Sequence, residues 1–413
     1  MKYLERHVEV LLTRYARLFK VIMIAGARQV GKSTLLQHFL PGVTCVTFDP
    51  IQDPYGARTD PDRFLDTFGS PLLLDEVQYA PELLPAIKRR VDGSDRKGQY
   101  YLCGSQNLAV LRTVSESLAG RVGILRLDGM TLAEQHGQAQ VKSWLGQYLH
   151  DPAQFVNQPR QDRSLISSSV PLTTMLWRGQ LPGLLEFENN ADVPAYFSSY
   201  VQTYIERDVR VMGNVSDLAL FGRFLRLCGA MTAREINQSQ FGRDIGVSPK
   251  TARHWLDLLV HSYQWTELPA YSGNTIKRLS MKPKGHIQDS GLACYLQTLS
   301  SPESLLASPL LGQIYESWCV GWLRSQLARL PISPGLWHWR TENGAEVDAV
   351  LEQDGKLYPI EFKASTQVSG HDTRGIQAFR TTYPQAQPGV ILFAGHEAWS
   401  ISPHAAAIPW NAI

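Results

Sequence analysis

One glycine-rich motif constrains the fold of this chain more than any other feature of its sequence. The eight residues GARQVGKS, from Gly26 to Ser33, match the pattern GxxxxGK[ST] at every fixed position. They follow a short apolar run, Val21 to Ala25, and lead into a helical stretch that ends near Phe39. Glycines in such a loop let backbone N–H groups turn inward around phosphates, and the start of the helix adds a positive dipole. The motif therefore predicts a phosphate-binding loop between a buried strand and a helix.

The residues of this loop are the first candidates for nucleotide contact. We expect Lys32 to place a positive charge against the phosphates and the Ser33 hydroxyl to ligate Mg²⁺. The full set expected to bind ATP is Gly26, Ala27, Arg28, Gln29, Val30, Gly31, Lys32, Ser33 and Thr34. ATP and Mg²⁺ are the predicted ligands of this part of the chain.

Further apolar runs alternate with helical stretches, and polar residues follow each run. The runs are Val43 to Phe48, Pro71 to Leu74 and Gln99 to Cys103. This alternation predicts an α/β fold with a parallel sheet, in which the site lies at the carboxyl ends of the strands. An amphipathic helix is expected before the first strand, over Lys2 to Phe19.

Polar residues at the predicted strand ends supply candidate catalytic groups. Asp75 is placed to hold the Mg²⁺ shell, and Glu76 to orient or deprotonate the attacking water. Asn107, beyond the next strand, could sense the γ-phosphate. Arg121 could neutralise charge in the transition state, either in its own chain or in a neighbouring subunit; the alternative is an ordinary surface arginine.

Length and composition bound the organisation of the chain. Its 413 residues suggest two or three domains, which we place at residues 1–185, 186–305 and 306–413. The balance of 40 basic against 38 acidic residues excludes a histone-like protein but leaves room for local basic patches. Five scattered cysteines without a CxxC pair indicate reduced thiols. No apolar run reaches the roughly 18–20 residues that span a bilayer, so we expect a cytoplasmic protein without membrane contact.

The middle of the chain contains a candidate helix-turn-helix. The stretch FGRDIGVSPKTARHWLDLLV, residues 241–260, predicts two helices with Gly246 in the turn and Ser248 as a cap. Arg253 could reach a base edge of DNA. A basic strip that could serve as the wing of a winged-helix-like unit follows: Lys277, Arg278, Lys282 and Lys284. The alternative is a unit that packs between its neighbours and contacts no DNA.

Two runs near the C-terminus carry acids and a lysine. Glu346-Val-Asp348 begins the first run, and Glu361-Phe-Lys363 ends the second. This pattern resembles the PD-(D/E)xK nuclease core, which implies a restriction-endonuclease-like α/β domain. In such a site Glu316, Asp348 and Glu361 would hold a divalent metal, and Glu361 and Lys363 would act in catalysis. The simpler alternative is an exposed ion pair, and a fold can keep such carboxylates for structure or binding.

Several longer stretches resemble a known family. They are GARQVGKSTL (26–35), LLLDEVQYAPELLPAIKRRVD (72–92), LCGSQN (102–107), SLAGR (117–121) and YIERD (204–208). Together they are similar to a large prokaryotic family of ATP-binding proteins with an N-terminal AAA-type P-loop module and a nuclease-like C-terminal domain of unknown function. The resemblance covers nearly the whole chain apart from residues 138–185. It implies ATP binding, with ATP hydrolysis as the expected activity.

The leading hypothesis is a Mg²⁺-dependent ATPase whose nucleotide state governs a winged-helix-like and nuclease-like C-terminal half that acts on DNA. Two other classes stay open. One is a non-catalytic nucleotide switch whose terminal unit binds a partner, and the other is a transcription regulator that uses the helix-turn-helix. Because AAA-type modules often need a neighbouring subunit to complete the site, assembly into a homo-oligomer is also left open.

Overall fold

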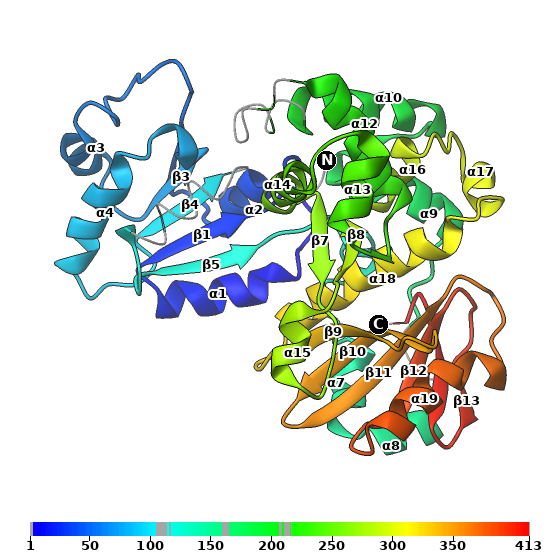
Figure 1. Cartoon of the computed structure of the whole chain (residues 1–413). Helices are drawn as coiled ribbons and strands as arrows, with labels where there is room; N and C mark the ends of the chain where they lie inside the picture. Colours follow the sequence, from blue (N-terminus) through cyan, green and yellow to red (C-terminus); the bar gives the residue numbers. More distant parts are fainter. Residues whose placement is uncertain are drawn as a thin grey trace.

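A five-stranded parallel sheet forms the centre of the N-terminal unit, at the left in Figure 1. The computed structural model describes residues 3–104, 114, 117–158, 165–205, 209, 215 and 217–412. The order across the sheet is β2-β3-β4-β1-β5. The strands are β1 (Val21–Ala25), β2 (Thr44–Thr47), β3 (Leu72–Asp75), β4 (Tyr100–Gly104) and β5 (Val122–Arg126). The predicted α/β class with a parallel sheet is confirmed.

Helices cover both faces of this sheet. Ile22 and Ile24 of β1 belong to one buried cluster, whereas Val21 and Met23 belong to another, because successive side chains of a strand point to opposite faces. The first cluster lies under α1 and α2 and the second under α3 and α4. These helices are α1 (Val8–Leu18), α2 (Lys32–Phe39), α3 (Pro61–Phe68) and α4 (Leu83–Asp92). A short helix, α6 (Leu132–Gln135), follows the sheet.

The middle unit combines helices with a small antiparallel sheet. Helices α13 (Gln238–Ile245) and α14 (Pro249–His261) flank a turn, and Ser248 caps α14 by accepting a hydrogen bond from the Thr251 amide. The sheet has the order β6-β8-β7, with β6 (Arg234–Glu235), β7 (Trp265–Leu268) and β8 (Lys284–Ile287). The predicted helix-turn-helix is confirmed, and its expected core residues are buried: Trp255, Leu256, Leu258 and Leu259.

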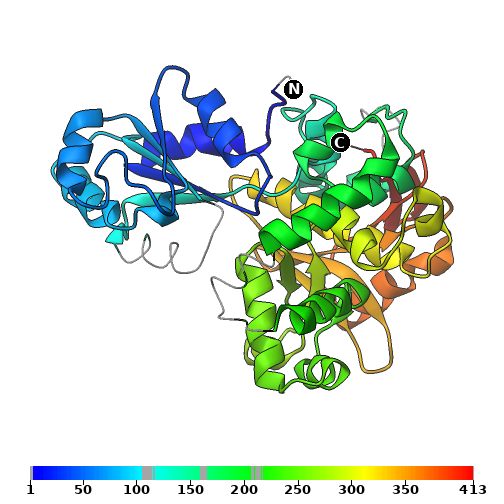
Figure 2. The ribbon, with the colours of Figure 1, turned by 90° about the horizontal axis from the view of Figure 1, so that it is seen from above.

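The remaining helices of the middle unit surround α16, which contacts α9, α10 and α12. Viewed from above, these elements form part of a second lobe beside the N-terminal sheet (Figure 2). They are α9 (Leu172–Arg178), α10 (Val193–Tyr200), a π-helical turn (Val201–Ile205), α12 (Leu218–Ala230), α15 (Thr275–Ser280), α16 (Ser290–Leu296) and α17 (Pro302–Leu306), with short 3-10 turns at Pro182–Glu186 and Asn190–Asp192.

A six-stranded mixed sheet forms the C-terminal unit. Its order is β13-β14-β12-β11-β10-β9, antiparallel from β9 to β11 and parallel from β11 to β14. Helix α18 (Leu311–Ala328) precedes the sheet, and α19 (Arg374–Thr382) connects β11 to β12. The strands are β9 (Gly335–Arg340), β10 (Glu346–Gln353), β11 (Lys356–Lys363), β12 (Gly389–Phe393), β13 (Trp399–Ser402) and β14 (Ala405–Pro409).

Two helices from residues 138–185 pack against this C-terminal unit. Figure 1 shows α7 (Trp144–His150) and α8 (Pro152–Asn157) against the C-terminal strands. The Tyr148 hydroxyl donates a hydrogen bond to the carbonyl oxygen of Pro388 at 2.9 Å. Apolar side chains of both helices are buried there: Trp144, Leu145, Tyr148, Phe155 and Val156. These apolar residues therefore pack on strands far along the chain, and the domain boundary at residue 185 stays a prediction.

Two expectations from composition can be compared with the structure. All five cysteines are free, and four of them are buried. None of the helices in the described residues is both long and apolar enough to cross a bilayer.

Candidate functional site

The glycine-rich loop leaves the carboxyl end of β1 and enters α2 directly. Gly31 caps α2 in the left-handed conformation, with φ of 91°, which favours glycine. At Gly26 an added Cβ would lie 2.1 Å from the carbonyl oxygen of Leu127, which follows β5. Both fixed glycines of the motif are therefore required by the local geometry.

Lys32 places its ammonium inside this loop. Its side chain is buried, and Nζ donates to the carbonyl oxygens of Gly26 at 3.0 Å and Ala27 at 2.6 Å. Burial lowers the pKa of Lys32 to about 8, although the Glu76 carboxylate acts in the opposite direction. A desolvated positive charge enclosed by a turn of backbone suits an anionic ligand such as a phosphate.

The two predicted Mg²⁺ ligands, Ser33 and Asp75, both contact the thiol of Cys103. Strand β4 lies between β1 and β3, and its Cys103 Sγ donates to Asp75 Oδ1 at 2.7 Å. Burial and then the Asp75 carboxylate raise the pKa of the Cys103 thiol well above its usual value, while a hydrogen bond with Ser33 lowers it. Ser33 and Asp75 thus lie on either side of Cys103, and their hydroxyl and carboxylate oxygens fit the ligand chemistry of Mg²⁺. The contact with Cys103 was not predicted.

Glu76 lies directly beyond this carboxylate. Its backbone adopts the left-handed conformation with φ of 54°, and its carboxylate accepts a hydrogen bond from the side-chain amide of Gln78. The Glu76 carboxylate raises the pKa of Lys32, so its charge favours the ammonium form of that lysine. Thr34, by contrast, is exposed on α2.

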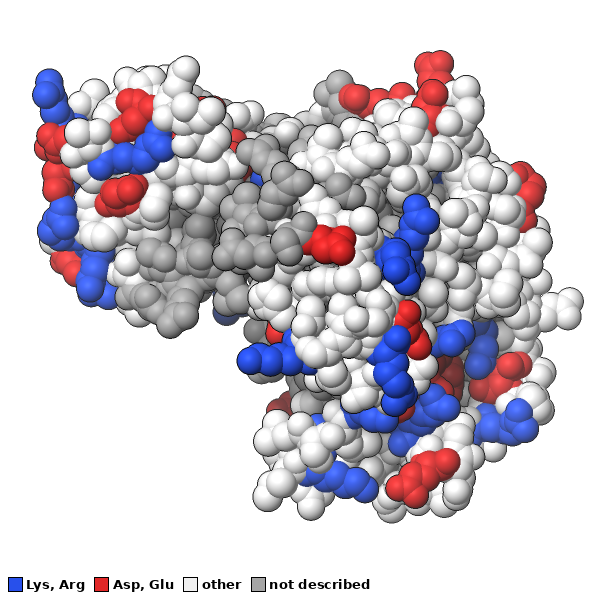
Figure 3. All heavy atoms as spheres, turned by 45° about the horizontal axis from the view of Figure 1, so that its top comes forward, with Lys and Arg blue, Asp and Glu red and all other residues white. Residues whose placement is uncertain are grey.

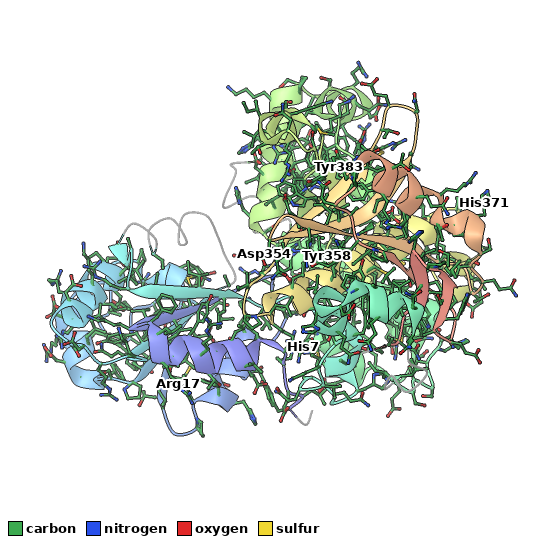
Figure 4. The ribbon with its side chains drawn as sticks, turned by 90° about the horizontal axis from the view of Figure 1, so that it is seen from below. His7, Arg17, Asp354, Tyr358, His371 and Tyr383 are labelled. Carbon is green, nitrogen blue, oxygen red and sulfur yellow. The ribbon has the colours of Figure 1, made fainter. Side chains whose placement is uncertain are left out.

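A buried arginine that was not predicted holds the loop from the N-terminal side. Arg6 donates from Nη1 to the carbonyl oxygen of Val30 at 2.8 Å and from Nε to Glu134 at 3.1 Å. Burial opposes ionisation of Glu134, but Arg6 keeps the pKa of that carboxyl below its usual value. The amide of His7 donates to the same carboxylate at 2.7 Å. Figure 4 labels His7 where the N-terminal lobe meets the rest of the molecule.

Helix α10 of the middle unit supports the outer side of the loop. The Tyr200 hydroxyl donates to the carbonyl oxygen of Arg28 at 3.4 Å and accepts from the Gln264 amide at 3.1 Å. The Tyr196 hydroxyl donates to the side-chain oxygen of Gln29. No motif in the sequence marked these tyrosines, because the contact joins residues about 170 positions apart.

Asn107 and Arg121 are two further groups predicted for this site. Asn107 lies outside the described residues. The carbonyl oxygen of Arg121 accepts from the Val21 amide at the start of β1, whereas the loop follows the end of that strand. The Arg121 guanidinium pairs instead with Asp92. Because the length of β1 separates Arg121 from the phosphate loop, Arg121 cannot reach the loop of its own chain. A role in cis is therefore excluded.

The basic residues expected to contact DNA are mostly paired within the molecule. Arg253 binds Asp257 at 3.0 Å and Glu267 at 2.6 Å, and Arg278 binds Glu352 at 2.7 Å. On the face shown in Figure 3, Lys and Arg side chains lie among Asp and Glu side chains. The predicted wing is occupied by α15. Carboxylates pair with Arg278 and Lys284 of the strip, whereas Lys277 and Lys282 are exposed.

The acids predicted for the C-terminal site do come together. Glu316 of α18, Asp348 of β10 and Glu361 of β11 line one open cavity of about 1280 Å³ with Lys363. The Phe362 amide donates to Asp348 Oδ2 at 2.9 Å, and Lys363 Nζ lies 3.7 Å from Glu361. Topology thus brings the predicted carboxylates and lysine to one place.

Lys284, which the sequence places in the predicted wing, lies among these acids. Lys284 Nζ lies 2.8 Å from Glu316 and 3.4 Å from Asp348, and it also pairs with Glu346. Burial and then the Asp348 carboxylate raise the pKa of Glu316 to about 8, whereas Lys284 lowers it. The same two causes raise the pKa of Glu361 well above its usual value. Lys284 is therefore a buried partner of carboxylates and not a wing residue.

The predicted metal set does not fit a metal ion as the side chains lie. Within the residues that the structure describes, no three His, Cys, Asp or Glu side chains form a group that could hold one. An ammonium fills the space between the carboxylates of Glu316 and Asp348. The metal assignment of Glu316, Asp348 and Glu361 is accordingly not supported by this arrangement.

Three family matches divide the chain. Residues 18–136 match the AAA domain family. Residues 171–303 match a domain of unknown function (DUF8612), and residues 311–413 match a second one (DUF4143). Together with the loop geometry, the first match identifies residues 18–136 as an AAA-type, ATP-binding P-loop ATPase module.

Relatives and solved structures match large parts of this chain. Two uncharacterized proteins, one from Mycobacterium bovis and one from Mycobacterium tuberculosis, are each 26% identical over 395 residues, which is 95% of this chain and 80% of theirs. A Walker-type ATPase of Pyrococcus abyssi is 14% identical with a TM-score of 0.42, covering 69% of this chain and 93% of its own. The RuvB Holliday junction branch migration motor of Thermotoga maritima is 15% identical with a TM-score of 0.30, covering 66% and 93%.

Proposed function

We propose that this protein is a Mg²⁺-dependent ATPase whose nucleotide state is passed through the middle unit to the C-terminal unit. One observation carries the proposal: hydrogen bonds connect the phosphate loop to β8. The Tyr200 hydroxyl donates to the carbonyl oxygen of Arg28 and accepts from the side-chain amide of Gln264. The backbone carbonyl oxygen of Gln264 in turn accepts from the backbone amide of Gln288 at 3.0 Å. Gln288 directly follows β8, and the first residue of β8, Lys284, lies in the C-terminal acidic cluster. A shift of the loop around phosphates would therefore act on the strand that reaches this cluster.

The residues of the loop suit ATP hydrolysis by attack of water. Glu76 would orient or deprotonate the water, and Lys32 would neutralise charge on the γ-phosphoryl group. Ser33 and Asp75 would hold Mg²⁺, which would offset the negative charge of the phosphates. Arg121 could act only at the site of a neighbouring subunit, so that an arginine finger would require a homo-oligomer.

ATP hydrolysis by the purified full chain tests this proposal. We expect Mg²⁺-dependent turnover in the wild type and a loss of about 10²-fold or more in Lys32→Ala and Glu76→Gln. Gln37→Ala, an exposed change on the same helix α2, is the matched control and should retain turnover. Undiminished hydrolysis in Lys32→Ala would show that the site is wrongly assigned.

Coupling to the middle unit needs a separate measurement. Hydrogen–deuterium exchange of residues 284–287 is expected to change when ATP is added to the wild type, and to stay constant in Lys32→Ala. If the wild type binds ATP but hydrogen exchange in β8 does not change, the proposed transmission from the loop to β8 is contradicted.

DNA cleavage by a restriction-endonuclease-like C-terminal unit is the second candidate, and a metal-dependent reaction there would require Lys284 to leave the carboxylates of Glu316 and Asp348. The observation that favours it is the gathering of Asp348, Glu361 and Lys363 in one open cavity. The winged-helix-like unit beside it would then contact DNA through exposed cations such as Lys277 and Lys282. Linear and supercoiled DNA incubated with Mg²⁺ or Mn²⁺, with and without ATP, tests this candidate. Cleavage lost in Asp348→Ala would support it, and intact DNA under every condition would favour a nucleotide switch without nuclease activity.

A further inference from the structure

We propose that the Lys284 ammonium occupies the cation position of the C-terminal acidic cluster and keeps divalent metal ions out of it. By acidic cluster we mean Glu316, Glu346, Asp348 and Glu361. The proposal goes beyond ATP hydrolysis, since it concerns the nucleotide-free protein and a part of the molecule far from the phosphate loop in sequence.

Lys284 reaches the acidic cluster from another unit. It begins β8, the central strand of the small sheet β6-β8-β7, while its partners lie on α18 and β10. Only 2% of its side chain is exposed. A lysine is almost never buried to this degree unless its charge is compensated, so the carboxylates around it are what keep it inside.

The donors and acceptors of this contact match in number. An ammonium has three N–H donors, and Lys284 Nζ has three carboxylate partners: Glu316 at 2.8 Å, Asp348 at 3.4 Å and Glu346. The other oxygen of Asp348 accepts from the Phe362 amide at 2.9 Å. Both oxygens of Asp348 and one oxygen of Glu316 are therefore engaged by protein N–H groups.

Lys284 and a divalent ion exclude each other. Mg²⁺ and Mn²⁺ bind carboxylate oxygens at roughly 2.0–2.2 Å, so an ion held between Glu316 and Asp348 would compete with the ammonium for the same two carboxylates. The Lys284 ammonium and a divalent ion bound to the same carboxylates would repel each other strongly in a buried site. A metal ion could enter only if β8 withdrew its lysine. The cluster is accordingly closed by a residue of the middle unit, and removal of that residue should open it.

A purely structural ion cluster would behave differently. If the carboxylates served only to hold β8 against the C-terminal unit, loss of the lysine would weaken that contact without creating a metal site. The two interpretations can be separated by metal binding in variants that lack the ammonium.

The test is Mn²⁺ binding to the nucleotide-free full chain, followed by the electron paramagnetic resonance of free Mn²⁺. We expect no binding to the wild type that depends on Asp348, and an affinity about tenfold or more higher in Lys284→Met. Adding Asp348→Asn to Lys284→Met should remove the gain. Lys282→Met is the matched control: it removes the same charge from an exposed residue two positions earlier and should leave Mn²⁺ binding unchanged.

A second neutral variant guards against misfolding. Lys284→Gln retains two N–H donors for the acids and should show the same gain in Mn²⁺ affinity. Folded neutral variants that bind no more Mn²⁺ than the wild type would overturn the proposal. Mn²⁺ binding to the wild type that disappears in Asp348→Asn but persists in Lys32→Ala would also overturn it, and this arm requires no change at Lys284. None of these outcomes depends on whether the protein hydrolyses ATP.

Discussion

The hydroxyl of Tyr200 lies 3.4 Å from the carbonyl oxygen of Arg28, so that a side chain of the middle unit touches the backbone of the phosphate loop. Tyr200 is the last residue of α10, outside the AAA-type module. Its hydroxyl also accepts a hydrogen bond from Gln264, which directly precedes β7. The loop is thus supported from outside by a second unit, and its position is tied to that of the small sheet.

Tyr200→Phe should weaken communication between these units while leaving the ring in place. The variant loses the bonds of Tyr200 to Arg28 and Gln264, at a cost of about 1–2 kcal/mol in the free energy of unfolding. We expect the ATP-induced change in hydrogen exchange of residues 284–287 to shrink. Tyr358→Phe is the control, because it removes a hydroxyl bond to the Leu149 carbonyl within the C-terminal unit. A full ATP response in Tyr200→Phe would argue against this route.

Gly26→Ala should disable the phosphate loop by a clash. The added methyl would lie 2.1 Å from the Leu127 carbonyl oxygen, which is backbone and cannot turn away as a flexible side chain would. We expect a destabilisation of about 1–3 kcal/mol, measured by urea unfolding, and a loss of ATP binding. Gly222→Ala in α12, where no atom lies within 4 Å, should be neutral or stabilising by about 0.5–1 kcal/mol. Similar unfolding curves for both variants would contradict this account.

The N-terminal fold follows from patterns that a sequence displays locally. The apolar run Val21–Ala25 is β1, and the turn and cap of the helix-turn-helix lie at the expected residues, since strands and caps depend on neighbours in the chain. The first helix is shorter than its apolar spacing predicts. It begins at Val8, and Arg6, which precedes it, binds the loop carbonyl of Val30.

The departures come from contacts that join distant parts of the chain. Helices α7 and α8 pack on each other, and their apolar side chains are also buried against the C-terminal sheet and Trp322 of α18, which are far away in sequence. Lys284 was grouped with basic neighbours along the chain, yet its charge is met by Glu316 and Asp348, which are 32 and 64 positions away. Sequence spacing identifies the acids of such a cluster, but it does not show which cation lies between them.

Arg121→Ala should leave the ATP turnover of the isolated chain nearly unchanged. Arg121 pairs with Asp92 at the end of the sheet opposite the phosphate loop. The change therefore removes no charge from the nucleotide site of the same chain, and the rate per chain in dilute protein should stay within about threefold of the wild type. Loss of turnover only at concentrations where chains associate would assign Arg121 to a neighbouring site. A large loss in the dilute protein would contradict the placement.

The depressed pKa of Lys32 predicts that ATP binds less tightly as the pH rises. Burial lowers this pKa to about 8 in the nucleotide-free protein, so the ammonium is charged below pH 8 and loses its proton above it. Phosphate groups stabilise the charged form and raise the pKa in the complex. Binding above pH 8 must therefore take up a proton, whereas binding well below pH 8 takes up none.

The dissociation constant of ATP should accordingly be constant below pH 8 and rise above it, with a limiting slope of about tenfold per pH unit. Fluorescence titrations at several pH values give the slope, and calorimetry in buffers of different ionisation enthalpy counts the protons. Lys32→Arg is the control: its guanidinium stays protonated over this range, so whatever affinity remains should not fall with the same slope. A dissociation constant that stays level through about pH 9.5, without proton uptake, would mean that the Lys32 ammonium is not the charge that meets the phosphates.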